Sequence, residues 1–427
     1  MKEKKEFKKW EKIFIIISCS VIGISFFVYL GRFVYYYNLE HQKIQVNTLL
    51  QEVTSKTVNT GDGLYIKDSD NYFYKGIDVA NYVWYSGNLY RIISISESNI
   101  KMITDSNLSI IAWGTGSKFK ESYLYSWLNN YEDNESIFLN SINNYQVYLK
   151  DFNYCNSSIN KKCINKENYL SSLLTRSEYL NAGGKLSFLN NESNYWIIDD
   201  TNEIEKAYIF KEGGIGSEDE KTIALASYGV RPVITINGNI TNFEGKGTAT
   251  EPYIIKEESG NTLLDKKVGE YITYKDYIFR ISNKGDNGIK VILDKKLDGV
   301  SLNYFGLADY LNSFASKFNN LGTCKYYANV YGSNSNYDYK NVYINPYETN
   351  VGLVNIGDLF MGDDDSYWLY NSYDQNGELA YKLSTSSTII ADTKGTNNGV
   401  RPVLCLNKDI KITSGNGTKT SPYVLED

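Results

Sequence analysis

The chain has few of the residues that carry nucleophilic, acid–base and zinc chemistry. Its 427 residues include one histidine, five cysteines and three methionines. The histidine, His41, belongs to the segment before the globular part, which excludes Ser-His-Asp catalysis, Cys-His catalysis and a histidine zinc site. No C-x-x-C pair occurs in the sequence. Carboxylate-only chemistry is the catalytic option that this inventory leaves.

What the chain does have is an internal repeat. The segment GVRPVITINGNITNFEGKGTATEPY begins at Gly229, and GVRPVLCLNKDIKITSGNGTKTSPY begins at Gly399. Thirteen of these 25 aligned positions are identical without a gap. Earlier landmarks follow in the same order in both halves, which indicates a tandem duplication.

Rare residues fall at matched positions of the two copies. Only six arginines stand against 38 lysines, and only five prolines occur. A guanidinium kept where lysine is the usual cation indicates a need for its planar set of donors. We expect these arginines to be structural, with ligand contact as the alternative. The matched pairs are Arg91 with Arg280, Arg231 with Arg401, Pro232 with Pro402 and Trp196 with Trp368.

The first 60 residues predict a membrane anchor. Residues 1–12 form a basic tail of net charge +3, and residues 13–31 carry no charge over 19 positions. At about 1.5 Å per helical residue this run spans a hydrocarbon core of ~30 Å, and the lysines place the N-terminus in the cytoplasm. A cleaved signal peptide and a lipidated cysteine are the alternatives. Residues 32–60 are then predicted to form an extracytoplasmic helical stalk.

The charge of the remaining chain bears on its partners. The whole chain carries −6, and the basic tail with Arg32 contributes +4, so the part beyond the anchor carries −10. Nucleic-acid binding requires basic surfaces, so we expect no nucleic-acid partner.

The periodicity of each copy predicts an α+β fold, with repeat domain 1 over residues 61–257 and repeat domain 2 over 258–427. Alternating apolar residues predict hairpin strands at the start of each copy. YLYSWLNNY has the apolar stripe of a helix. Thr175 with Glu178 forms a capping box that Asn355 with Asp358 echoes, so each copy is expected to hold a second short helix.

The cysteines and one acidic run give two local hypotheses. Cys155 and Cys163 flank a polar loop and are candidates for a disulfide, whereas Cys405 reads as a small buried residue and Cys324 has no assignment. Three consecutive carboxylates supply hard oxygen ligands for calcium, with a solvated acidic loop as the alternative. They are Asp363, Asp364 and Asp365.

Several of these segments resemble a known but uncharacterised family of bacterial cell-surface proteins. The likeness rests on GDGLYIKDSDNYFYKG, NYVWYSGNLYRIISIS, LLTRSEYL and GVRPVL with GNGTKTSPY. It covers nearly the whole chain after residue 60, in two tandem copies, and implies a low-GC Gram-positive or related bacterium. The order of elements is also similar to C-type-lectin-like domains and to the formylglycine-generating enzyme fold. That enzyme needs a reactive cysteine pair, and the cysteines here occupy no matched positions.

These observations predict a single-pass membrane protein that displays two tandem C-type-lectin-like α+β domains outside the cell. The domains are expected to bind a glycan or a protein without catalysis and without a cofactor other than calcium. A carboxylate-based hydrolase of surface glycans is one alternative. A structural or assembly component of the cell envelope is the other.

Overall fold

The computed structural model divides the chain into two units, Met1–Asn47 and Thr48–Asp427. The side chains of residues 152–159, 162–167, 206–210 and 220–223 are not part of the description. The residues it describes are 10, 13, 23, 25–33, 47–114, 116, 118–129, 136–142, 149–150, 152–159, 162–190, 193–199, 206–210, 220–223, 227–257, 259–328, 342–343, 345–361, 365–373, 377–385 and 388–427.

The first unit corrects the expectation of a transmembrane anchor. Residues 25–33 are helical and exposed. No helix built from the described residues has both the length and the apolar character that crossing a bilayer requires. The described residues therefore do not show the anchor expected over residues 13–31, of which residues 14–22 and 24 lie outside the description.

The second unit corrects the fold class. In the structure as a whole, strands hold 38% of the residues and helices 19%, so the architecture is mainly β and the expected pair of C-type-lectin-like α+β domains is wrong. The α-helices described in this unit are short. They are α2 (Leu49–Thr54), α3 (Tyr123–Asn129), α4 (Ile137–Ser141), α6 (Arg176–Asn181) and α7 (Leu307–Ala315), of which α4 was not expected from the sequence.

Two sheets form most of the first half of this unit. The larger has the order β15 (Phe243–Glu244), β16 (Tyr253–Ile255), β3 (Tyr82–Tyr85), β4 (Asn88–Ser96), β5 (Asn99–Thr104), β14 (Val233–Asn237), β9 (Ser171–Ser172). The hairpin β1 (Gly63–Asp68) and β2 (Asn71–Lys75) joins it through β4. The smaller has the order β12 (Glu220–Ile223), β11 (Lys206–Phe210), β10 (Tyr195–Trp196), β13 (Ser227–Val230), β6 (Ser109–Ala112).

The second half builds two sheets with the same strand order. The larger runs β29 (Ile412–Ser414), β30 (Tyr423–Leu425), β17 (Tyr271–Tyr274), β18 (Tyr277–Lys284), β19 (Ile289–Leu293), β28 (Pro402–Leu406), β23 (Val351–Leu353). The smaller runs β26 (Ile389–Thr393), β25 (Leu379–Leu383), β24 (Tyr367–Ser372), β27 (Asn398–Gly399), β20 (Ser301–Leu302). Two hairpins stand apart, β7 (Phe152–Ile159) with β8 (Lys162–Tyr169) and β21 (Cys324–Tyr326) with β22 (Tyr347–Thr349).

Strand direction is also the same in the two halves. The pair β16 and β3 is parallel, as is β30 with β17, and β10 with β13 is parallel, as is β24 with β27. The closing strands β14 and β28 lie inside the larger sheets, which explains their continuous apolar runs. The boundaries at residues 61, 257 and 258 stay a prediction, because Thr48–Asp427 forms one compact unit.

The segment expected to be a stalk belongs partly to this unit. Helix α2 starts from the capping box of Thr48 and Gln51 and ends at Thr54. Its Leu49 and Val53 are fully buried, and the Leu49 amide donates to Ile240 O at 2.7 Å. This helix therefore packs on the first half of the unit.

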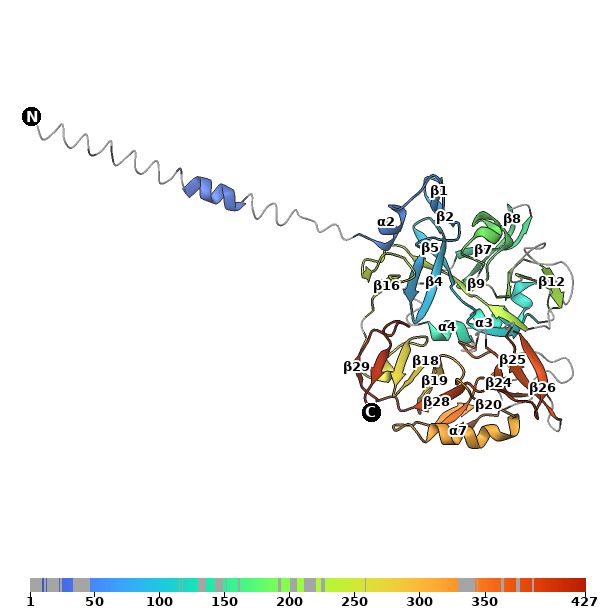
Figure 1. Cartoon of the computed structure of the whole chain (residues 1–427). Coiled ribbons are helices and arrows are strands. Elements are labelled where there is room, and N and C mark those ends of the chain that lie inside the picture. The colour runs from blue at the N-terminus through green and yellow to red at the C-terminus, as the bar shows by residue number, and fades with distance from the viewer. Residues whose placement is uncertain are drawn as a thin grey trace, which may run out of the picture. The chain divides into compact units, whose positions relative to one another are not determined.

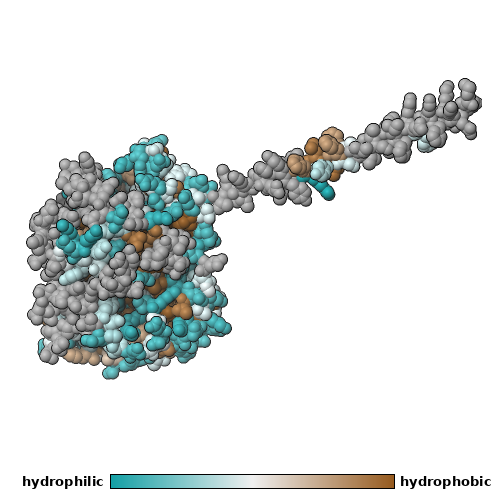
Figure 2. Space-filling model, turned by 180° about the vertical axis from the view of Figure 1, so that it is seen from behind, coloured by the Kyte–Doolittle hydropathy of each residue, from teal (hydrophilic) through white to brown (hydrophobic). Residues whose placement is uncertain are grey.

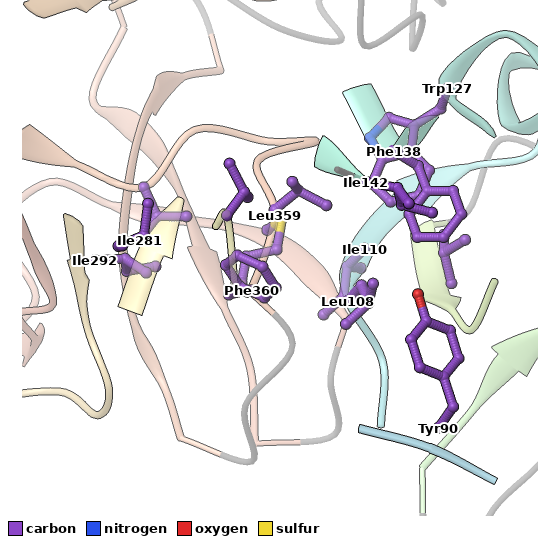
Figure 3. Close-up of a cluster of buried hydrophobic side chains, with 14 of the residues drawn as sticks. Tyr90, Leu108, Ile110, Trp127, Phe138, Ile142, Ile281, Ile292, Leu359 and Phe360 are labelled. Carbon is purple, nitrogen blue, oxygen red and sulfur yellow. The ribbon is translucent and has the colours of Figure 1, made fainter. Parts of the chain in front are cut away.

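The two halves share one hydrophobic core. Figure 1 shows α3 and α4 between the sheets of the first half and those of the second. Trp127 of α3 donates from Nε1 to Gly357 O at 2.9 Å, and the Phe360 amide donates to Leu108 O. Figure 3 shows Leu359 and Phe360 of the second half facing Leu108 of the first. By contrast, hydrophilic residues predominate on the described surface of the unit in Figure 2.

Candidate functional site

A pocket of about 530 Å³ lies where the two halves meet. Its walls come from matched positions of both copies, which distinguishes it from a pocket inside one repeat. The matched lining pairs are Tyr82 with Tyr271, Arg91 with Arg280, Asp105 with Asp294, Ser106 with Lys295 and Phe188 with Phe360.

In the first copy, Arg91 lies between two aromatic rings. It stands on β4 opposite Tyr82 of β3, and its guanidinium carbon is 3.7 Å from the Tyr82 ring centroid and 5.0 Å from that of Phe188. Its Nε donates to Asn81 Oδ1 at 2.5 Å, and Nη1 pairs with Asp105 at 3.4 Å. Burial lowers the pKa of Arg91, while Tyr82 and Asp105 oppose that shift. The side chain is thus fixed and still contributes positive charge.

Arg280 repeats this arrangement and also joins the two copies. It stands on β18 opposite Tyr271, and its guanidinium carbon lies 3.8 Å from the Phe360 centroid and 4.9 Å from that of Tyr271. Its Nε donates to Gly269 O at 2.8 Å, while Nη2 crosses to Gly87 O at 3.1 Å and to the Asn88 side chain. Burial is the main cause that lowers the pKa of Arg280.

The other matched arginines connect strands within each copy. Arg231 donates to the carbonyls of Thr104 and Leu189 at 2.9 and 2.8 Å. Arg401 donates to Leu293 O at 2.8 Å, to Asp294 O at 2.9 Å and to the Tyr367 hydroxyl at 3.0 Å. Both are buried and bond backbone carbonyls, and Arg401 also lines the pocket.

Positive charge exceeds negative charge in the pocket lining. Asp105 pairs with Arg91, and Asp294 pairs with Lys419 at 3.4 Å. In the described part of the chain, neither Arg280 nor the exposed Lys295 forms an ion pair with a carboxylate. The cations that line the pocket are Arg91, Arg280, Arg401, Lys295 and Lys419, against the two carboxylates of Asp105 and Asp294.

Short polar side chains complete the wall. They are Ser106, Asn107, Ser187, Asn190 and Ser193. Asn107 donates from Nδ2 to Ser193 Oγ at 3.1 Å, while its buried Oδ1 accepts no hydrogen bond from the described residues. Hydroxyl and amide groups beside aromatic rings can bond the hydroxyls of a polar ligand.

The matched tryptophans and prolines lie behind the pocket rather than in it. Trp196 donates from Nε1 to Ile111 O at 2.9 Å, and Trp368 donates to Leu302 O at 2.8 Å. Both indoles are fully buried. The Pro232 carbonyl accepts from the Thr104 amide at 3.0 Å, and Pro402 begins β28. The tryptophans therefore connect strands of the smaller sheets, whereas the prolines belong to the strand regions of the larger sheets, which carry Arg91 and Arg280.

Cys405 was expected to be a small buried residue, but the structure shows it in a disulfide with Cys324. The Cα atoms of Cys324 and Cys405 lie 5.7 Å apart, with a sequence separation of 81 residues. The side chains of Cys155 and Cys163, on β7 and β8, lie outside the description, so their disulfide stays a prediction.

The described residues give little support to the calcium hypothesis. Asp363 and Asp364 lie outside them, and Asp365 pairs with Lys296 at 3.2 Å. Where the structure is described, no group of three or more His, Cys, Asp or Glu side chains is arranged to hold a metal ion.

Sequence reasoning found the four arginines but missed their partners. The aromatic residues Tyr82, Phe188, Tyr271 and Phe360, and the carboxylates Asp105 and Asp294, also stand at matched positions. Comparing every polar and aromatic position of the two copies, not only the rare types, supplies the signal for these residues.

Comparison with known proteins finds no matching family model, no matching curated protein and no matching solved structure. The site's own chemistry therefore carries the functional argument.

Proposed function

We propose that this chain is a non-catalytic binding protein that recognises an acidic saccharide in the pocket between its two repeats. The observation that carries the proposal is the excess of cations over carboxylates in that pocket, within a chain whose net charge is −6. A ligand carboxylate balances this local charge.

The rest of the lining fits a sugar. Tyr82 and Tyr271 supply aromatic surface beside short hydroxyl and amide side chains. Sugar rings present apolar faces to aromatic residues and hydroxyls to groups such as Asn107 and Ser193. The fixed positions of Arg91 and Arg280 favour binding, because little side-chain freedom is then lost.

The disulfide supports a location outside the cytoplasm. Disulfides persist in oxidising compartments, and Cys324 with Cys405 forms one inside the second repeat. An extracytoplasmic binding protein is in the right place to meet cell-surface or host glycans.

The test is a titration of residues 47–427 with trigalacturonic acid and with its methyl ester, which has the same sugar skeleton without the charge. We expect saturable binding of the acid, weaker binding of the ester, and a loss of affinity with rising salt. Lys295→Gln and Lys419→Gln each remove one cation near solvent and are expected to weaken binding about fivefold, or ~1 kcal/mol.

Lys246→Gln is the matched control, because Lys246 lies on the equivalent glycine turn of the first copy, where it pairs with Glu251. Its affinity for the acid should stay at the wild-type value. Glycan-array screening with sialylated and uronic sugars extends the search to other acids. The proposal is contradicted if the protein binds none of the acidic saccharides, or if it hydrolyses one that it binds.

A further inference from the structure

A second and larger pocket, of about 870 Å³, lies on another side of the contact between the repeats. Helix α4 of the first half forms one wall, and the end of β18 with the start of β19 forms another. One lining residue, Lys290 of β19, has an exact counterpart in the first copy, which is Lys101 of β5. The two lysines have different surroundings.

In the first copy the lysine is neutralised. Lys101 Nζ forms an ion pair with Glu178 Oε1, and this lysine is buried. The other oxygen of Glu178 accepts from the amide of Thr175 at 3.0 Å and from its hydroxyl at 2.9 Å. One carboxylate thus caps α6 and also balances the lysine charge.

In the second copy the acid is one methylene shorter. Asp358 takes the place of Glu178, and its Oδ2 accepts from the Asn355 amide at 2.9 Å, as the equivalent oxygen does in the first copy. Its Oδ1 accepts from the Tyr343 hydroxyl at 2.7 Å instead of from a lysine. Both oxygens are therefore engaged away from Lys290.

Lys290 is left with aromatic partners. Its Nζ lies 4.4 Å from the Tyr326 centroid and 5.6 Å from the Tyr327 centroid. No carboxylate in the described part of the chain forms an ion pair with it, and Asp358 acts on it only at longer range. Burial lowers the pKa of Lys290, and burial likewise raises the pKa of Asp358. An anion beside Lys290 Nζ would offset the cost of burying the positive charge of this lysine.

Apolar and aromatic groups form part of the remaining wall, together with the charged side chains of Lys284, Lys325, Asp286 and Glu348. Ile137 of α4, Val268 and Leu359 line the pocket together with the rings of Tyr327 and Tyr343. A ligand with an apolar or aromatic body suits such a wall better than a sugar does.

We infer that this pocket is a binding site for a carboxylic acid with an apolar or aromatic body, whose carboxylate pairs with Lys290 in place of the glutamate that the first copy supplies internally. The site is independent of the saccharide pocket, which none of these residues lines.

The experiment is a calorimetric titration of residues 47–427 with 2-naphthoate and with the uncharged 2-naphthamide at neutral pH. Lys290→Met and Asp358→Glu are each expected to weaken naphthoate binding about tenfold or more, which corresponds to ~1.4 kcal/mol. Asp358→Glu is the sharper variant, because it keeps the lysine and lengthens the acid to the size that pairs with it in the first copy. Naphthamide should bind the wild type at least tenfold more weakly.

Two controls separate this site from general effects. Lys101→Met changes the counterpart lysine outside the pocket, and Lys295→Gln changes the saccharide pocket, so both should bind naphthoate within about twofold of the wild type. Thermal unfolding of each variant identifies any that does not fold, and either Lys290→Met or Asp358→Glu alone decides the question. Unchanged naphthoate affinity in a folded variant of this pair, or equal binding of naphthamide, overturns the inference.

Discussion

The four arginines at matched positions are the residues on which both the fold and the candidate site depend. Arg231 and Arg401 bond carbonyl oxygens of neighbouring strands, while Arg91 and Arg280 lie against aromatic rings at the pocket wall. A guanidinium serves both roles because it stays charged and directs several donors in one plane. Lysine carries its donors on a single nitrogen and cannot direct them in one plane at widely separated carbonyls.

The substitution Arg401→Lys tests whether the fold requires a guanidinium at this position. The change removes donors to Leu293 O, Asp294 O and the Tyr367 hydroxyl, all of which lie in a buried region. We expect the free energy of unfolding to fall by about 2–3 kcal/mol, measured by urea denaturation.

The matched control is Arg176→Lys, because the Arg176 side chain is exposed at the start of α6. Its unfolding free energy should stay within about 0.5 kcal/mol of the wild-type value. Equal stabilities of the two variants rule out a structural role for the Arg401 guanidinium.

At the scale of elements, the sequence predicts those features that depend on local patterns. The apolar stripe of α3 buries Leu124, Trp127 and Leu128, and the capping box of Thr175 and Glu178 starts α6 as expected. The closing strands and their glycine turns are also present: Gly247 and Gly417 have φ of 82° and 78°, and each lies against a tyrosine ring.

The helix expected after Asn355 fails for a tertiary reason. Asn355 and Asp358 do bond each other, yet Gly357 and Phe360 adopt positive φ values of 86° and 67°, which end any helix. This turn is held by bonds to Trp127 and Leu108 of the other copy. Local sequence carries no information about partners more than 200 residues away, and the pocket lining is missed for the same reason.

The disulfide between Cys324 and Cys405 is expected to stabilise the second repeat by joining two of its elements. Cys324 lies on β21 and Cys405 on β28, so the bond ties a two-stranded hairpin to the larger sheet of the second repeat. Cys324→Ala is expected to lower the unfolding free energy by about 2–4 kcal/mol, since the unfolded chain loses a long closed loop. Chemical denaturation measures this, and wild-type protein kept in reductant should match the variant. Identical denaturation curves for oxidised wild type and variant contradict the prediction.

At the scale of the whole molecule, the contact between the two copies creates a pocket that neither copy has alone. The copies approach closely at Gly87 and Gly269, where an added Cβ on Gly87 would meet Val268 O at 2.2 Å and one on Gly269 would meet Gly87 O at 2.3 Å. Arg280 then bonds across this contact. Two binding domains were expected from the sequence, whereas the pocket that we propose for an acidic saccharide is lined by residues of both copies.

The most direct measurement is therefore the stoichiometry of acidic-saccharide binding. Trigalacturonic acid is titrated calorimetrically into the Lys290→Met variant of residues 47–427, so that binding to the second pocket does not add to the signal. We expect one ligand per chain, and we expect Lys295→Gln in the same background to lower the affinity without changing the stoichiometry. Two equivalent sites per chain, one for each repeat, or the absence of binding, would contradict it.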